Sequence, residues 1–291
     1  MSTHTVIEQA LAAAVATTPQ ERLYVVADLA MRPDALQTIT GARRPASARC
    51  LMSPAAGAGV DDVAPWLVEL GWTDELPHSR LHASVSIAVD VPALSWIVSP
   101  LSAVELAARL VRRLDVELQG GQTMLLRWYD PRILPELHAV LHDEQRSAFE
   151  AVGSRWCWVE RGSDLRVLEL YGAPPQDPMA ATLQLDQTQE DRLIWVSERE
   201  QFIAELSQHM PDAFHVRPPR QRAAWVEQWM RQSLQSGLAA HADQLLLMCL
   251  ALTHGDEFLQ RSPWRDAWPQ VTSGRLSLRE ALARCERSSA A

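Results

Sequence analysis

The spacing of hydrophobic and polar residues divides the chain into a mixed first part and a helical second part. Residues 22–29 (RLYVVADL) and 93–100 (ALSWIVSP) are short apolar runs with β-branched or aromatic residues, which are typical of buried strands. Leu106, Leu110 and Leu114 then recur every four residues, and this spacing predicts a helix with one buried stripe. The first part is therefore expected to combine strands with helices.

Capping signals predict where several helices begin. The pattern Ser/Thr-x-x-Glu occurs at residues 5–8, 102–105, 197–200 and 277–280. In this pattern the first side chain accepts the backbone N–H of the fourth residue, and the Glu side chain reaches back to the backbone N–H of the first. We expect a helix to begin at each of these four positions.

The last third of the mixed first part predicts a strand, a tight turn, a helix and a hairpin. Residues 122–130 (QTMLLRWYD) have the composition of a strand, and the prolines after them predict a tight turn over 131–134 and a helix over 135–149. Residues 154–170 indicate a β-hairpin. Because 93–130 has the order strand, helix, strand, part of the sheet is expected to be parallel.

A proline-containing segment separates two predicted domains. We expect an α/β (α+β) domain with a mixed sheet over 1–171, a linker over 172–191 with three prolines, and a smaller all-helical lobe over 192–291. The lobe begins with one short predicted strand, LIWV at 193–196. The helix predicted over 239–254 is apolar almost all round, so it should be the central buried helix of the lobe.

Composition and charge exclude several classes of function. The 291 residues carry a formal net charge of −9, which disfavours nucleic-acid binding because that binding depends on clustered basic side chains. All 27 basic residues are arginine, so a lysine-containing phosphate loop, a Schiff-base lysine and a Ser-Lys dyad are excluded. The four cysteines are far apart and indicate neither a zinc site nor a disulfide framework. No cofactor is expected.

The apolar runs are too short for a membrane span. The longest, residues 245–252, has eight residues, whereas a spanning helix needs about 20. The first residues lack a basic stretch and include Glu8 within their apolar run, which disfavours a secretory signal. We therefore expect no membrane insertion and a cytoplasmic location.

Two histidines are candidate metal ligands. His138 and His142 are four residues apart on a predicted helix, the spacing of two ligands on one face. No third ligand is evident, so a solvated helix face is the favoured interpretation and no metal is expected. The nucleophile motif G-x-S-x-G is also absent. These observations favour a protein that is not an enzyme.

Asp28 and Asp130 each end a predicted buried strand, close to Arg127 and Arg132. One hypothesis is a hydrolase that uses the two carboxylates at a sheet edge. The alternative is a structural corner, in which Asp130 caps the following turn and an arginine pairs bidentately with Asp28. Since no nucleophile or set of metal ligands lies nearby in the sequence, the structural interpretation is favoured.

Tryptophan is frequent, with eleven Trp against four Phe and three Tyr. Trp225 with Trp229, and Trp264 with Trp268, are four residues apart, so each pair can share one helical face. Core packing is the favoured interpretation. The alternative is a partner surface together with Arg222, because Trp and Arg are enriched in binding hot spots.

Five segments within residues 22–160 resemble a known family in their order and spacing: RLYVVADLA, VAPWLVEL, WIVSPLSAVELAARLVRRL, MLLRWYDPRIL and EQRSAF…GSRWCWVE. This series is similar to the motifs of the bacterial type VI secretion adaptor chaperones (Tap or TEC proteins), long catalogued as a domain of unknown function. The matching motif positions are Tyr24, Asp28, Arg127, Tyr129, Asp130, Pro131 and Arg132.

The resemblance implies an adaptor that binds a toxic effector and helps to load it onto the VgrG spike or its PAAR tip. The expected partners are therefore an effector encoded nearby and VgrG or a PAAR protein, and the expected mechanism is binding without catalysis. Two alternatives remain open: the hydrolase that uses Asp28 and Asp130, and an immunity protein that neutralises a type VI toxin.

Overall fold

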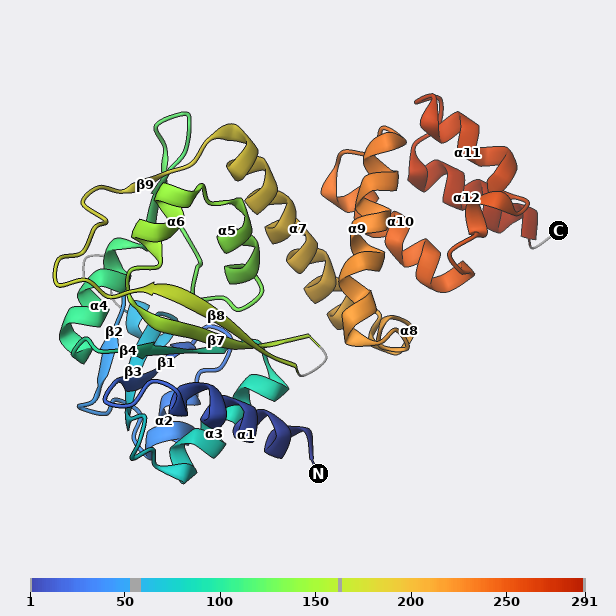
Figure 1. The fold of residues 1–291 in the computed structure, drawn as a ribbon. Helices are drawn as coiled ribbons and strands as arrows, with labels where there is room; N and C mark the ends of the chain where they lie inside the picture. Colours follow the sequence, from blue (N-terminus) through green and yellow to red (C-terminus); the bar gives the residue numbers. More distant parts are fainter. Residues whose placement is uncertain (1, 53–58, 162–163, 290–291) are drawn as a thin grey trace. The chain divides into compact units, whose positions relative to one another are not determined.

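The computed structural model describes residues 2–52, 59–161 and 164–289. The chain forms two compact units, Met1–Ile194 and Trp195–Ala291. Unit 1 combines sheets with helices, and unit 2 is helical (Figure 1). The expectation of an α+β first part followed by a helical part is confirmed.

The main sheet of unit 1 has six strands in the order β2-β3-β1-β4-β7-β8. Their bounds are β1 Arg22–Asp28, β2 Ala48–Cys50, β3 Pro65–Trp72, β4 Leu94–Ser99, β7 Gly153–Glu160 and β8 Asp164–Gly172. Every neighbouring pair is antiparallel. The expected parallel pairing after β4 is therefore wrong for this sheet, because the chain that follows β4 and helix α4 (Ala103–Arg112) enters a second, smaller sheet.

The smaller sheet has the order β6-β5-β9. Its strands are β5 Asp115–Glu117, β6 Thr123–Leu125 and β9 Leu183–Gln184. Strand β6 is antiparallel to β5, and β9 is parallel to β5. The strand predicted over 122–130 is thus correct only as far as Leu125.

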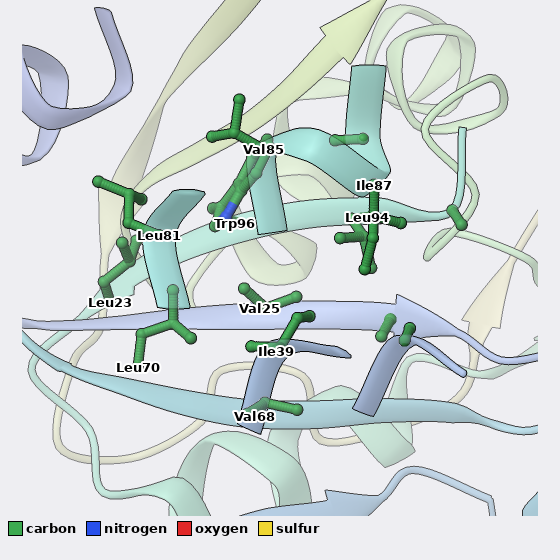
Figure 2. Packing of buried hydrophobic residues seen from close by; sticks show 14 of the residues in the cluster. Leu23, Val25, Ile39, Val68, Leu70, Leu81, Val85, Ile87, Leu94 and Trp96 are labelled. Carbon is green, nitrogen blue, oxygen red and sulfur yellow. The ribbon is translucent and has the colours of Figure 1, made fainter. Parts of the chain in front are cut away.

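Three helices cover one face of the main sheet: α1 Thr3–Ala16, α2 Ala35–Thr40 and α3 His78–Asp90. Figure 2 shows their side chains, such as Ile39 and Val85, meeting strand side chains such as Val25 and Trp96. Helices α5 (Leu134–Val140) and α6 (Asp143–Phe149) lie on the opposite side of the sheet (Figure 1). The sheet is therefore the middle layer of unit 1.

The helix predicted over 135–149 is broken into α5 and α6. Leu141 has an extended backbone, with φ −65° and ψ 135°, and ends α5. His142 then caps α6, because its backbone N–H donates to Oε1 of Gln145 at 2.9 Å. His138 and His142, the two candidate metal ligands considered in the sequence, consequently do not share one helix.

Helix starts agree with the capping signals at two of the four positions. Helix α4 (Ala103–Arg112) has the expected capping box of Ser102 with Glu105, and α12 (Leu278–Ser289) follows Ser277 paired with Glu280. At the N-terminus Ser2 is the cap of α1, and Thr5 lies inside the helix.

Helix α7 (Gln187–His209) begins ten residues before the predicted start. Asp186 and Gln189 form the cap, since the backbone N–H of each donates to the side chain of the other at 3.1 and 2.9 Å. The predicted strand at 193–196 is therefore wrong, because its four apolar residues lie inside α7. A short apolar run cannot distinguish a strand from a buried helical turn by itself.

The segment predicted as a linker is attached to α4 by two buried arginines. Arg109 donates to the carbonyl oxygen of Pro174 at 2.6 Å, and Arg113 donates to both carboxylate oxygens of Asp177 at 2.8 and 3.0 Å. The same segment also contains β9 and the start of α7.

The described residues of unit 2 form the C-terminal part of α7 and five further α-helices: α8 Pro211–His215, α9 Pro219–Gln235, α10 His241–His254, α11 Trp264–Thr272 and α12. A short 3₁₀ helix, η3, spans Phe258–Gln260. The predicted helices ending near Gly237 and spanning 239–254 are confirmed within two residues. Helix α10 supplies Leu247, Met248 and Ala251 to the core of this unit.

Candidate functional site

Four charged residues singled out in the sequence meet at one place in unit 1. Asp28 ends β1, whereas Arg127, Asp130 and Arg132 lie in the turn between β6 and α5. We call these four residues the Asp-Arg corner. Both carboxylates are buried, and both lie near the same atom, Nη2 of Arg127.

Asp130 is the centre of the corner. Its Oδ1 accepts the backbone N–H of Arg132 at 3.0 Å and Nε of Arg132 at 2.9 Å. Its Oδ2 accepts Nη2 of Arg132 at 2.8 Å and Nη2 of Arg127 at 3.1 Å. The predicted capping of the turn by Asp130 is confirmed. The bidentate arginine pair, however, is formed by Asp130, where we had predicted Asp28.

Asp28 has a different environment. Its Oδ1 accepts the backbone N–H of Ala30 at 3.0 Å, and its Oδ2 lies 3.5 Å from Nη2 of Arg127. Among the described residues this Oδ2 has no hydrogen-bond partner. Burial raises the pKa of the Asp28 carboxyl above its usual value, although the charge of Arg127 opposes the shift.

Of the other three motif residues, Tyr129 and Pro131 lie in the same turn as the corner, and Tyr24 lies apart from it. Tyr129 is buried, and burial raises the pKa of its phenol; its ring lies against the buried Trp128. Pro131 is buried in the turn. Tyr24 is four residues before Asp28 along β1, about 13 Å away, and its hydroxyl donates to the carbonyl oxygen of Leu101 at 2.6 Å. The structure therefore does not bring Tyr24 into the corner.

Chemically, this arrangement fixes a turn and neutralises two buried carboxylates with two guanidinium groups. Arg127 is the exposed member of the four, with 47% of its side chain accessible. Within the described ranges no three His, Cys, Asp or Glu side chains gather to hold a metal ion. The two carboxylates converge on arginine nitrogens.

The contrast between the two aspartates predicts a contrast between two variants. Asp130→Ala should lower the free energy of unfolding by about 2–4 kcal/mol, because it leaves Arg132 and a turn N–H without their acceptor. Asp28→Asn should lower the free energy of unfolding by less than about 1 kcal/mol. The asparagine oxygen can keep the hydrogen bond from the backbone N–H of Ala30, and Oδ2 of Asp28 accepts no hydrogen bond from the described residues that could be lost. Urea denaturation of both variants measures the difference, and equal losses would contradict this assignment.

The two histidines face separate carboxylates. His138 contacts the buried Glu150, and Nε2 of His142 lies 2.9 Å from Oδ2 of Asp186. Burial raises the pKa of the Glu150 carboxyl, against the hydrogen bond from His138. The premise that both histidines lie on one face of one helix is therefore wrong.

The tryptophans proposed as a partner surface belong largely to the core of unit 2. Trp225, Trp229 and Trp264 are buried, and Trp268 is half-buried against them. Arg222 lies over the ring of Phe214 within the same unit. The alternative of an exposed aromatic surface is therefore wrong for the three buried rings, because apolar helical faces pack on each other first.

Sequence reasoning missed two features. The buried arginines Arg109 and Arg113 were not singled out, although each directly precedes a leucine of the predicted apolar stripe, Leu110 or Leu114. The exposure of strand β6 was also missed, because its apolar residues Met124 and Leu125 gave the predicted strand the composition of a buried one. A glycine pair before the strand marked the hairpin turn but gave no sign of exposure.

Comparisons with known proteins give one family match. No helix in the described part of the chain is long and apolar enough to cross a membrane. No curated protein and no solved structure matches the chain. The matching family model is that of a domain of unknown function (DUF4123), and it covers residues 23–148, from β1 to the end of α6, with the whole Asp-Arg corner inside it.

Proposed function

We propose that this protein is a non-enzymatic adaptor that binds a type VI secretion effector in the cytoplasm and helps to load it onto a VgrG or PAAR spike. Two observations lead to this family of functions. The ordered motifs within residues 22–160 resemble those of the type VI adaptor chaperones, and the family model covers 23–148 of the same region. Neither observation identifies the contact surface, which has to come from the structure.

The observation that carries the proposal is the exposed strand β6 beside Arg127. Met124 is 53% exposed and Leu125 is 46% exposed. Neighbouring residues of a strand point to opposite faces, so β6 is open on both faces as well as at its outer edge. Met and Arg are enriched at protein interfaces. We call Met124, Leu125 and Arg127 the β6 surface.

The Asp-Arg corner gives this surface a fixed position. Just after β6, the backbone N–H of Leu126 donates to the carbonyl oxygen of Leu114 at 2.6 Å. Asp130, three residues after Arg127, accepts a hydrogen bond from the Arg127 guanidinium. An ordered apolar surface loses less conformational entropy on binding than a mobile one. The corner therefore serves binding by holding the β6 surface in place.

The test is co-purification with the effector encoded by the neighbouring gene. Met124→Glu combined with Leu125→Glu should weaken effector binding at least about 30-fold, the loss expected for a hot spot of about 2 kcal/mol. Val104→Glu is the matched control, because Val104 is a 62% exposed valine on α4. Binding constants come from titration calorimetry with purified proteins.

Failure of the unsubstituted protein to bind both the effector and the spike would overturn the adaptor proposal. Equal weakening by the control would instead show that added charge, and not the β6 surface, is responsible. Binding that is lost only in the β6 variant would support the assignment.

A hydrolase remains the second candidate because of one observation. A buried carboxylate with a raised pKa and an unpartnered oxygen is a common feature of active sites, and Asp28 has both. Hydrolytic activity that Asp28→Asn abolishes without a change in stability would favour this candidate over the adaptor. Nothing in the arrangement of the described residues favours the immunity-protein alternative.

A further inference from the structure

Strand β8 forms one edge of the main sheet over its whole length. It has nine residues, whereas β2 at the opposite edge has three. None of the nine is buried, and Val167 and Tyr171 are 41% and 59% exposed. Five of the nine residues are apolar: Leu165, Val167, Leu168, Leu170 and Tyr171.

The outer edge of β8 offers unused backbone groups. In an antiparallel ladder, every second residue turns its N–H and C=O away from the paired strand. Across the described part of the chain, residues 165–172 make no backbone hydrogen bond apart from their pairing with β7. A row of such groups is a template for another strand.

Part of the usual protection of an edge strand is missing here. Natural edges are blunted by proline or by charged side chains, and β8 contains no proline. Three of its residues are charged: Asp164, Arg166 and Glu169. Two of these charges are paired with strand β7, since Arg166 pairs with Glu160, and Glu169 pairs with Arg155 at 2.8 Å. The edge is therefore largely apolar and nearly neutral, because two negative side chains and one positive side chain leave β8 a formal charge of −1.

We propose that β8 binds an extended, apolar and uncharged segment of the effector, which adds to the main sheet as a seventh strand. This inference rests on the proposed adaptor function. Backbone pairing requires an extended occupant, and the nearly neutral edge disfavours a charged one. The β6 surface and β8 belong to the same compact unit, so one bound effector can reach both.

A second copy of this chain fits the edge less well. In a two-fold antiparallel pair, opposite residues share a face, so their positions add up to an even number. Arg166 and Glu169 are three apart and can never face each other across such a pair. Centring the pair on Arg166 or Glu169 opposes like charges, and centring it on Val167 or Leu168 places Glu169 against an apolar residue. Centring it on Leu165 sets Asp164 against Arg166, but only residues 164–166 of the two β8 strands then pair. A strand of different sequence can pair along the whole edge without these mismatches.

The experiment introduces a lysine at the edge of the full-length protein. Val167→Lys and Tyr171→Lys should each weaken binding of the purified neighbouring effector by about tenfold or more, while Val104→Lys should bind as the unsubstituted protein does. Thermal unfolding checks that each variant stays folded. Hydrogen–deuterium exchange provides a second readout, since effector binding should slow exchange of the backbone amides of 165–171.

The outcomes separate this inference from the adaptor proposal. If the β8 variants bind the effector normally and the amides of β8 exchange at unchanged rates, β8 is not the docking edge, and the adaptor proposal stands. If the unsubstituted protein does not bind the effector, this inference fails, and the adaptor proposal fails with it if the spike is not bound either. If the protein is a dimer and Val167→Lys abolishes the dimer, the occupant of β8 is a second copy of the chain. If the β8 variants lose only spike binding, the occupant is the spike. Either result overturns the assignment of β8 to the effector. Should a lysine variant unfold, the exchange measurement on the unsubstituted complex decides.

Discussion

Replacing Arg113 with methionine is expected to lower the free energy of unfolding by about 3–5 kcal/mol, the loss typical of breaking a buried ion pair on one side. Arg113 is completely buried after α4, and its guanidinium donates to both oxygens of Asp177. It also donates to the carbonyl oxygens of Phe149 at 2.6 Å, Arg109 at 2.7 Å and Ala148 at 2.8 Å. Methionine fills similar space but donates to none of these acceptors.

Arg112→Met is the matched control, because Arg112 contacts the same carboxylate from the surface. Its Nη2 lies 3.2 Å from Oδ2 of Asp177, and its side chain is largely exposed. Exposed ion pairs contribute about 0–1 kcal/mol, so this variant should unfold almost as the unsubstituted protein does. Urea denaturation measures both, and a loss below about 1 kcal/mol for Arg113→Met would show that the segment around Asp177 contributes little to unit 1.

The same pair makes stability depend on pH on the acid side. Burial raises the pKa of the Asp177 carboxyl, but hydrogen bonds from Arg113 outweigh it and hold the pKa below the usual value. For a carboxyl whose pKa is lowered on folding, stability is fully present above the unfolded pKa, near 3.9, and is lost as pH falls through the folded pKa. Arg113→Met should remove this part of the acid dependence.

Local signals in the sequence were sufficient for helix α4. The Ser102–Glu105 capping box set its start, and Leu106 and Leu110 are buried as their spacing predicted. The role of Arg113 could not be predicted in the same way. Its partners Phe149 and Asp177 are 36 and 64 residues away along the chain, so only the tertiary fold makes Arg113 a buried side chain.

The error at 193–196 had a local cause that the sequence did contain. Asp186 and Gln189 have the spacing of a capping box, and a helix begun there continues through the apolar residues that resemble a strand. The direction of the strands was harder to predict. Strand, helix, strand predicts a crossover only if both strands enter one sheet, and here β6 enters the smaller sheet.

For the Asp-Arg corner, the sequence indicated the participants but not their pairing. Asp28 and Asp130 both end apolar runs; Asp28 was expected to pair with an arginine, and Asp130 was expected to cap the turn. The turn at Pro131 decides which carboxylate accepts the bidentate contact. It folds the side chain of Arg132 back onto the carboxylate of Asp130, which lies only two residues earlier in the chain. Turn geometry of this kind is not visible in residue spacing.

Gly153→Ala is expected to destabilise unit 1 by about 3 kcal/mol or more, at the upper end of the usual cost of overpacking. Gly153 begins β7 beside β4 and is buried. A Cβ at this position would overlap the carbonyl oxygen of Val98 and lie 3.1 Å from its carbonyl carbon and 3.3 Å from Cγ2 of Ile97. Two of these three atoms belong to the backbone of β4, so no side-chain rotation can relieve the overlap.

Gly120→Ala is the control for this glycine. A Cβ at Gly120 meets no atom within 4 Å, so the substitution should change the free energy of unfolding by no more than about 1 kcal/mol, in the stabilising direction because alanine restricts the unfolded chain. Because β4 and β7 connect β8 to the rest of the main sheet, Gly153→Ala should also weaken any binding at β8, and Gly120→Ala should not. Thermal unfolding of both variants measures the first effect. If Gly153→Ala were as stable as Gly120→Ala, β4 and β7 could move apart at Gly153 without a loss of stability. That result would contradict the prediction, which assumes that the two strands must stay as close as a glycine allows.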